Sequence, residues 1–416
     1  MSSRLRTRNK RPRRSPRRST RTVSPRIYVC ALVALFACAA FVFFYLHARR
    51  ESTAPRPVTQ VVPSPDRGER TVDAEVVAKR LQQVMERTGG SRIWIKTAGG
   101  SVGLHGGNAG EVLAVPSAFG ALLSAVRSES EKEGLQARIT ELSSPRRLRS
   151  VDLEMLQGAE PVCRWHLRAV PQIRRAAIII DDLGQDLGAA RQLLQLDYPL
   201  TFSVMPNLPY STEIAEEAYR AGREVMLHLP MQPEPGSATK VSPDELKVGM
   251  TGFAVRRTLE SDFVSVPHAA GVNNHMGSRA TADPELMAEV AQVLSERHLY
   301  FVDSRTTPDT VALEVARRMH LPAFYRSVFL DDTETTTYTL GQLRELRRVV
   351  QEQGVAIAIG HPHPTTLSAL AQFLPELEGD DIQLLPASRI TRLPEVGRLW
   401  PPRSKPLQAQ NTTPPP

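Results

Sequence analysis

The sequence predicts an α/β fold: an irregular (β/α) barrel of seven or eight units, preceded by a transmembrane helix and a small α+β domain. Short apolar runs alternate with amphipathic stretches over about 230 residues in the C-terminal half, which is typical of β-α units. Twenty consecutive uncharged residues lie near the N-terminus. The segment between this apolar run and the C-terminal half contains a stretch with helical periodicity and stretches in which apolar and polar residues alternate. A doubly wound open sheet is the alternative for the C-terminal half.

The formal charge of +8 is concentrated at the N-terminus. Residues 1–26 contain eleven Lys and Arg and no acidic residue, which leaves 41 basic against 44 acidic residues in the rest of the chain. The folded part therefore has no basic excess that would indicate nucleic acid, and we expect no nucleic-acid partner. We predict that residues 1–26 form a disordered cytoplasmic tail.

Residues 27–46, "IYVCALVALFACAAFVFFYL", are long enough to cross the hydrocarbon core as a helix. A buried core helix would show a polar stripe, which this segment lacks. The basic residues before it predict that the N-terminus stays inside. We therefore expect a single-pass anchor in the inner (cytoplasmic) membrane, with the C-terminal domains in the periplasm. A cleaved signal peptide is the alternative.

Composition divides the rest of the chain into four segments. Residues 47–71 are rich in Pro, Ser and charge and predict a linker, and residues 72–170 predict a small α+β domain of unknown role. The barrel is expected over 171–400, and 401–416 predict a disordered Pro-rich tail. Outside the apolar span the only cysteine is Cys163, so no intramolecular disulfide is expected there.

The barrel segment shows eight candidate strands, each followed by a helical or polar stretch. They are Ala176–Ile180, Leu200–Val204, Glu224–Leu227, Gly271–Asn274, Tyr300–Val302, Phe324–Leu330, Val355–Ile359 and Ile382–Leu385. In such barrels the functional site lies at the C-terminal ends of the strands.

Polar and ionisable residues follow seven of these strands. They are Asp181, Asp182, Asn207, His228, Asn273, Asn274, His275, Arg279, Asp303, Arg305, Asp331, Asp332, His361 and His363. A lone histidine at a strand end is usually a hydrogen-bonded surface or core residue, but this coincidence across seven strands predicts a site. Histidine and carboxylate form a ligand set for zinc or another first-row divalent ion. Such an ion would supply the positive charge that the adjacent Asp181 and Asp182 need when buried.

These strand ends resemble the polysaccharide deacetylase superfamily, and within it the divergent polysaccharide deacetylase family. The resemblance covers about residues 172–396 and rests on six stretches taken together. They are "IIIDDLG", "TFSVMPNLPYS", "GREVMLHLPMQP", "GVNNHMGSR", "FVDSRTT" and "AIAIGHPHPTTL".

The resemblance implies separate roles for the two adjacent carboxylates, with Asp181 as general base and Asp182 as metal ligand. The superfamily has a second metal-binding histidine four residues after the one that matches His228, but this sequence has Gln232 there. Amide side chains are poor ligands for zinc. The resemblance therefore makes His275 the candidate third ligand, and zinc the divalent metal expected.

The resemblance also implies a general acid, His361 or else His363, that protonates the leaving group. Arg279 or Arg305 is expected either to orient Asp181 or to be a structural strand-end arginine. The candidate substrate residues are Asn207, Asn274, Asp303 and His363. Asn273 and Asn274 are expected either to bind sugar hydroxyls or to fix the loop. Asp303 has a simpler explanation as a turn-forming residue, and Asp331 and Asp332 can likewise be explained as capping or turn residues.

The function expected from this resemblance is that of a membrane-anchored periplasmic hydrolase. It would use its metal to remove acetyl groups from a polysaccharide or from the glycan of peptidoglycan. Gln232 motivates one alternative, a catalytically degenerate barrel that acts as an envelope glycan-binding or scaffold protein. Another alternative keeps the metal but hydrolyses esters other than acetyl.

Overall fold

The computed structural model describes residues 59–61, 73–97, 108–142, 148–236 and 244–394. The expected basic tail, membrane span and C-terminal tail therefore lie outside the described residues. The expected linker also lies outside them, except for strand β1, Thr59–Val61, which pairs with a strand of the small domain. Among the helices of the described ranges, none is both long and apolar enough to cross a membrane.

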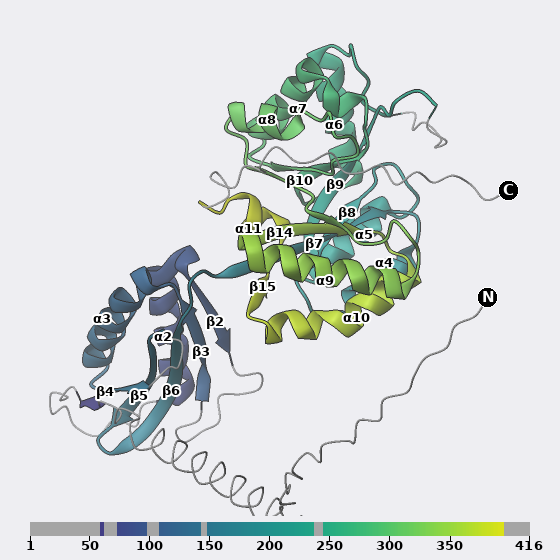
Figure 1. Cartoon of the computed structure of the whole chain (residues 1–416). Coiled ribbons are helices and arrows are strands. Elements are labelled where there is room, and N and C mark those ends of the chain that lie inside the picture. The colour runs from purple at the N-terminus through teal and green to yellow at the C-terminus, as the bar shows by residue number, and fades with distance from the viewer. Residues whose placement is uncertain (1–58, 62–72, 98–107, 143–147, 237–243, 395–416) are drawn as a thin grey trace, which may run out of the picture. The chain divides into compact units, whose positions relative to one another are not determined.

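Residues 74–169 form a sheet with two helices packed on it (Figure 1). In chain order the elements are α2 Ala74–Gly89, the 3-10 turn η1 Gly90–Arg92, β2 Ile93–Thr97, β3 Asn108–Ala114, α3 Pro116–Lys132, β4 Gln136–Leu142, β5 Ser150–Gln157 and β6 Glu160–Ala169. The strand order is β1-β4-β5-β6-β3-β2, and only the β3–β6 pair is parallel. Both helices share one core with the sheet, so they lie on the same face.

Local sequence explains these elements. The carboxylate of Asp73 accepts hydrogen bonds from the first free backbone amides of α2, and Val77 and Leu81, four residues apart, point into the core. Strand β6 buries Trp165 and Leu167 on the same face, as the two-residue period of a strand requires.

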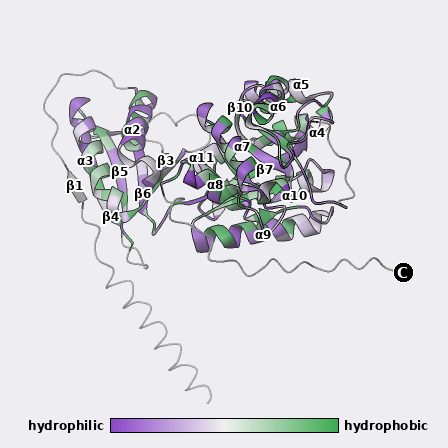
Figure 2. Ribbon diagram, turned by 90° about the horizontal axis from the view of Figure 1, so that it is seen from above, coloured by the Kyte–Doolittle hydropathy of each residue, from purple (hydrophilic) through white to green (hydrophobic). Residues whose placement is uncertain are grey.

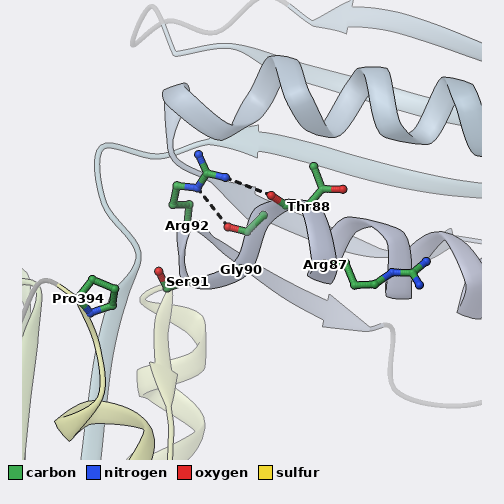
Figure 3. A pocket seen from close by; sticks show the side chains of 7 residues that line it. Arg87, Thr88, Gly90, Ser91, Arg92 and Pro394 are labelled. Atoms are coloured by element: carbon green, nitrogen blue, oxygen red, sulfur yellow. Dashed lines mark hydrogen bonds between the residues drawn. The ribbon is translucent and has the colours of Figure 1, made fainter. Parts of the chain in front are cut away.

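The C-terminal end of α2 borders a hollow (Figure 3). There the guanidinium of Arg92 donates from Nε to the carbonyl of Gly89 (3.3 Å) and from Nη2 to that of Thr88 (3.1 Å). These bonds satisfy carbonyls that the end of a helix leaves free. The side chains that α2 and η1 contribute to the hollow include no carboxylate, imidazole or thiol, so these elements offer it neither a metal ligand nor a general base.

Residues 174–384 form a nine-stranded parallel sheet. Its strands are β7 Arg174–Leu183, β8 Thr201–Val204, β9 Glu224–Met231, β10 Ala269–Met276, β11 Tyr300–Asp303, β12 Ala323–Tyr325, β13 Val328–Phe329, β14 Val355–Gly360 and β15 Ile382–Leu384. The order is β12-β11-β10-β9-β8-β7-β14-β13, with β15 also paired to β7. From β7 to β12 each strand lies beside its predecessor, which excludes the doubly wound alternative, in which the order reverses. The predicted α/β class with parallel strands is confirmed.

The predicted strand Phe324–Leu330 is instead two short strands, β12 and β13, with different neighbours. The backbone N–H of Arg326 donates to the carbonyl of Asp303 in β11 (2.9 Å), and that of Ser327 donates to Ile357 in β14 (2.8 Å). Strands β12 and β13, which form the two ends of the sheet, are thus connected by the backbone of Arg326 and Ser327 and not by strand pairing. A half-barrel with parallel strands results.

Helices follow most of these strands. They are α4 Leu187–Leu194, α5 Ser211–Arg220, α6 Gly252–Ser265, η2 Ala280–Ala282, α7 Pro284–Glu296, α8 Ala312–Arg318, α9 Thr336–Gln353, α10 Pro364–Gly379 and α11 Ala387–Thr391. Helix α9 mixes hydrophilic and hydrophobic residues along its length (Figure 2). Its buried side chains include Leu343, Leu346 and Val350, spaced three and four residues apart. Gly354 ends the helix in the left-handed conformation, with φ of 84°.

The strands that carry the candidate site are buried on both faces. In β7 every residue from Arg175 to Asp181 is buried, and all six residues of β14 are buried. Continuous burial of this kind is typical of parallel strands covered on both sides. Their carboxyl ends then meet at one edge of the sheet, which brings residues far apart in sequence together.

Candidate metal centre

Asp181 and Asp182 lie in an irregular part of β7. The pairing with β8 shifts register between Ile180 and Leu183, and Asp182 has a positive φ of 56°. Neighbouring residues of a regular strand point to opposite faces, but a bulge re-aims a side chain. Here both carboxylates face His228: Oδ1 of Asp181 lies 3.7 Å from its Nδ1, and Oδ1 of Asp182 lies 3.0 Å from its Nε2.

Three potential ligand atoms converge at this point, from Asp182 of β7, His228 of β9 and His275 of β10. Oδ1 of Asp182 lies 3.0 Å from Nε2 of His228 and 3.0 Å from Nδ1 of His275, and these two nitrogens are 3.1 Å apart. The three side chains form one group whose donor atoms could hold a single ion. The structure thus brings together the three residues predicted as ligands.

The chemistry of this group fits a divalent cation. Oδ1 of Asp182 is buried and has no hydrogen-bond donor among the described residues. Burial would raise the pKa of Asp182, but the imidazoles of His228 and His275 hold it well below its usual range. Burial would lower the pKa of His228, but Asp181 and Asp182 raise it. An ionised carboxylate facing two ring nitrogens is an oxygen and nitrogen donor set that suits zinc and related ions.

His361 stands beside this group and is paired with a buried carboxylate. Its Nδ1 lies 2.9 Å from Oδ1 of Asp331, and its Nε2 lies 3.8 Å from Oδ2 of Asp182. Burial alone would lower the pKa of His361, but the hydrogen bond and charge of Asp331 raise it to about 9. Protonated His361 therefore directs Nε2 toward Asp182 of the candidate metal centre at neutral pH.

Asp331 also belongs to a second group of potential metal ligands, together with His361 and His363. Its two oxygens already accept three hydrogen bonds: from Nδ1 and the backbone N–H of His361, and from the hydroxyl of Thr366. A Cβ on Gly360 would lie only 3.2 Å from Oδ2 of Asp331, so a glycine leaves room for this carboxylate. The pair fits a positioned imidazolium better than it fits a second ion.

Residues 178–391, just over half of the chain, match the sequence family described as divergent polysaccharide deacetylase. The chain belongs to this family. The resemblance expected from the strand ends is therefore confirmed.

Two relatives in other bacteria are described only as uncharacterised proteins. A protein of Haemophilus influenzae is 36% identical over 226 residues, which are 54% of this chain and 76% of that protein. YibQ of Escherichia coli is 35% identical over 230 residues, 55% of this chain and 71% of YibQ. The crystal structure of an uncharacterised protein of Agrobacterium tumefaciens has a TM-score of 0.50 at 23% identity, covering 52% of this chain and 89% of that one. This last likeness shows the fold alone.

Gln232, the departure from the superfamily pattern, is hydrogen-bonded to the backbone of the segment before α6. Its Oε1 accepts a hydrogen bond from the backbone N–H of Val248 (3.0 Å), and its own backbone N–H donates to Leu246 (2.9 Å). Gln232 thus anchors the segment before α6 to the end of β9. His275, on the neighbouring strand, supplies the third donor atom.

The side chain that donates to Asp181 is an amide and belongs to neither of the two candidate arginines. Nδ2 of Asn273 donates to Oδ1 of Asp181 (2.8 Å). The guanidinium of Arg305 lies over the ring of Tyr325, 5.3 Å from its centroid. The backbone N–H of Arg279 donates to the carbonyl of Gln232 (3.2 Å). The contact of Arg305 with Tyr325 corresponds to the structural alternative for that arginine.

Two of the four candidate substrate residues hold loops together. The side-chain carbonyl of Asn274 accepts from the backbone of Ser304 (2.9 Å), and its amide donates to the carbonyl of Met276 (2.8 Å). Asp303 is 1% exposed, and its oxygens accept from the backbone of Arg305 and the hydroxyl of Thr310. Burial raises the pKa of Asp303. These contacts favour the loop-fixing explanation of Asn274 and the turn-forming explanation of Asp303.

The other two candidate substrate residues lie in different surroundings. The amide of Asn207 donates to Asp244 (3.1 Å) and Asp262 (3.2 Å), so its contacts are structural. His363 lies beside His361, with ring centroids 5.7 Å apart, and is partly exposed. His363 is therefore a partly exposed side chain beside the candidate acid His361.

Sequence reasoning missed the partnership of Asp331 with His361 and the part played by Asn273. The sequence alone explains Asp331 only as a capping or turn residue. Its position carries a usable signal, because it ends a strand that neighbours the strand ending at His361. No comparable local signal distinguishes Asn273 from Asn274.

Proposed function

We propose that this chain is a metal-dependent hydrolase that removes acetyl groups from a polysaccharide or from the glycan of peptidoglycan. The observation that carries the proposal is the convergence of Asp182, His228 and His275 between a carboxylate, Asp181, and a protonated imidazole, His361. Ligands, base and acid thus lie within one site at the carboxyl ends of the strands.

Asp182, His228 and His275 would hold the ion. When bound, a divalent ion such as zinc supplies a Lewis acid that polarises an acetyl carbonyl and lowers the pKa of water. Asp181, fixed by Asn273, accepts the proton of the attacking water. His361 then gives its proton to the leaving nitrogen or oxygen of the sugar, so that acetate and a free amine or hydroxyl result.

The alternative of a catalytically degenerate barrel rested on Gln232. Since His275 supplies a third donor atom from another strand, that substitution does not leave the ligand set short. A scaffold would also have no use for an acid paired with a buried carboxylate beside the ligands. These observations favour an enzyme over a binding protein.

Acetate release tests the proposal. The purified full-length chain, with zinc and with a chelator, is incubated with peptidoglycan sacculi, an N-acetylated chitooligosaccharide and an O-acetylated xylan. We expect zinc-dependent release from at least one, and a fall of about 10²–10⁴-fold in Asp181→Asn, which lacks the base. Asp186→Asn is the matched control, because Asp186 caps α4 and asparagine caps equally well. Wild-type protein that releases no more acetate than Asp181→Asn would overturn the proposal.

A further inference from the structure

Asn273 is fully buried in β10 and connects three strands through its side-chain amide. Its Oδ1 accepts hydrogen bonds from Oγ of Ser203 in β8 (2.7 Å) and from Nδ1 of His228 in β9 (2.8 Å). Its Nδ2 donates to Oδ1 of Asp181 in β7 (2.8 Å). One amide therefore contacts both the candidate base and a candidate metal ligand.

The orientation of this amide follows from its partners. Ionised Asp181 only accepts hydrogen bonds, so the NH2 group of Asn273 must face it and the carbonyl oxygen must face His228. Nδ1 of His228 then carries a proton. A proton on Nδ1 leaves Nε2, which faces Asp182 and His275, as the nitrogen that can bind an ion once it is deprotonated.

The position suits an amide better than other side chains of similar size. An aspartate would accept from His228 but would confront Asp181 with a second carboxylate. A leucine would leave both His228 and Asp181 without a partner in a buried site. The hydroxyl of Ser203 supports the same carbonyl oxygen, so it helps to hold the amide in this orientation.

We propose that Asn273 is a positioning residue that the ligand and base halves of the site share. It selects the metal-binding tautomer of His228 with its carbonyl, and it orients the carboxylate of Asp181 with its NH2 group. The importance of this role for catalysis rests on the proposed function, but the effect on His228 does not.

Two substitutions of Asn273 in the full-length protein distinguish its contact with His228 from its contact with Asp181. Asn273→Asp keeps the acceptor for His228 and loses the donor to Asp181, so we expect zinc affinity at or above the wild-type value with acetate release at least about tenfold lower. Asn273→Leu loses both, so zinc affinity should also fall, by about 10–100-fold. Zinc affinity is measured by competition with a chromophoric chelator.

Ser203→Ala tests the support of the amide without changing Asn273 and should lower zinc affinity by less than Asn273→Leu does. Thr201→Ala is its matched control, because Thr201 is a buried residue of the same strand whose hydroxyl donates to Glu224 and accepts from the backbone N–H of Ala387, away from Asn273. It should bind zinc as the wild type does. Equal zinc affinities in wild type, Ser203→Ala and Asn273→Leu would overturn the positioning role.

The tautomer of His228 gives a readout that needs neither metal nor activity. Nitrogen-15 NMR of the metal-free protein, with the signal assigned by its loss in His228→Gln, should show the proton on Nδ1 in wild type and a changed signal in Asn273→Leu. If wild type shows this tautomer yet releases no acetate, the proposed function fails and the positioning of His228 stands. A His228 signal that is identical in wild type and Asn273→Leu contradicts the inference.

Discussion

The pairing of His361 with Asp331 determines when the candidate acid is charged. His361 carries its proton below its pKa of about 9, so the acid form is present at pH 7 and is lost as the pH rises through 9. Burial opposes this rise in the pKa, and the hydrogen bond to Asp331, followed by the negative charge of Asp331, is its main cause. The candidate acid His361 therefore depends on Asp331 for its charge at neutral pH.

Asp331→Asn should move the alkaline limb of the activity profile downward. Asparagine keeps an oxygen near Nδ1 of His361 but removes the charge, so the pKa of His361 should fall toward its ordinary value of 6.5. We expect the limb of kcat/KM for acetate release to shift by about one to two pH units. Thr366→Val, which removes a neutral hydrogen bond to the same carboxylate, should shift it less. Coincident alkaline limbs in wild type and Asp331→Asn would exclude His361 as the acid.

The strand ends are the elements that the sequence predicts best. Apolar runs such as "AAIII" mark buried parallel strands, and the ionisable residues that follow them are local in sequence, so their meeting at one edge follows from the fold class. Asp182, His228 and His275 were identified on this basis together with the family resemblance. The structure brings their donor atoms to within 3.1 Å of one another.

Features that depend on tertiary contacts were beyond the sequence. The bulge that turns Asp181 and Asp182 toward the same imidazole needs a positive φ at Asp182, a conformation that tertiary contacts must hold. The change of neighbouring strand at Arg326 depends on hydrogen bonds to residues distant in sequence, Asp303 among them. The sequence shows that Gln232 departs from the superfamily pattern, but it does not show that the side chain of Gln232 accepts a hydrogen bond from the backbone of Val248.

At the scale of the whole molecule, the proposed function needs the metal centre on the same side of the membrane as its glycan. We propose that residues 27–46 anchor the chain in the cytoplasmic membrane with the C-terminal domains outside. The twenty uncharged residues and the basic residues before them support this placement.

Protease accessibility tests the placement. In spheroplasts, whose cytoplasmic membrane is intact, added protease should destroy a C-terminal epitope tag on the full-length chain. A cytoplasmic protein in the same cells serves as the control and should survive until lysis. A C-terminal tag that is protected until lysis would contradict the proposed orientation.

Zinc titration of the metal-free, full-length protein by calorimetry tests most directly whether Asp182, His228 and His275 hold an ion. We expect about one zinc ion per chain, and a loss of affinity of more than about 100-fold in His275→Ala, which removes the donor that takes the place of the histidine missing at position 232. His268→Ala should bind as wild type does, because His268 stacks on Tyr219 outside the site. A wild-type chain that binds no zinc, or a His275→Ala variant that binds it with unchanged affinity, would contradict the proposal that these three residues hold an ion.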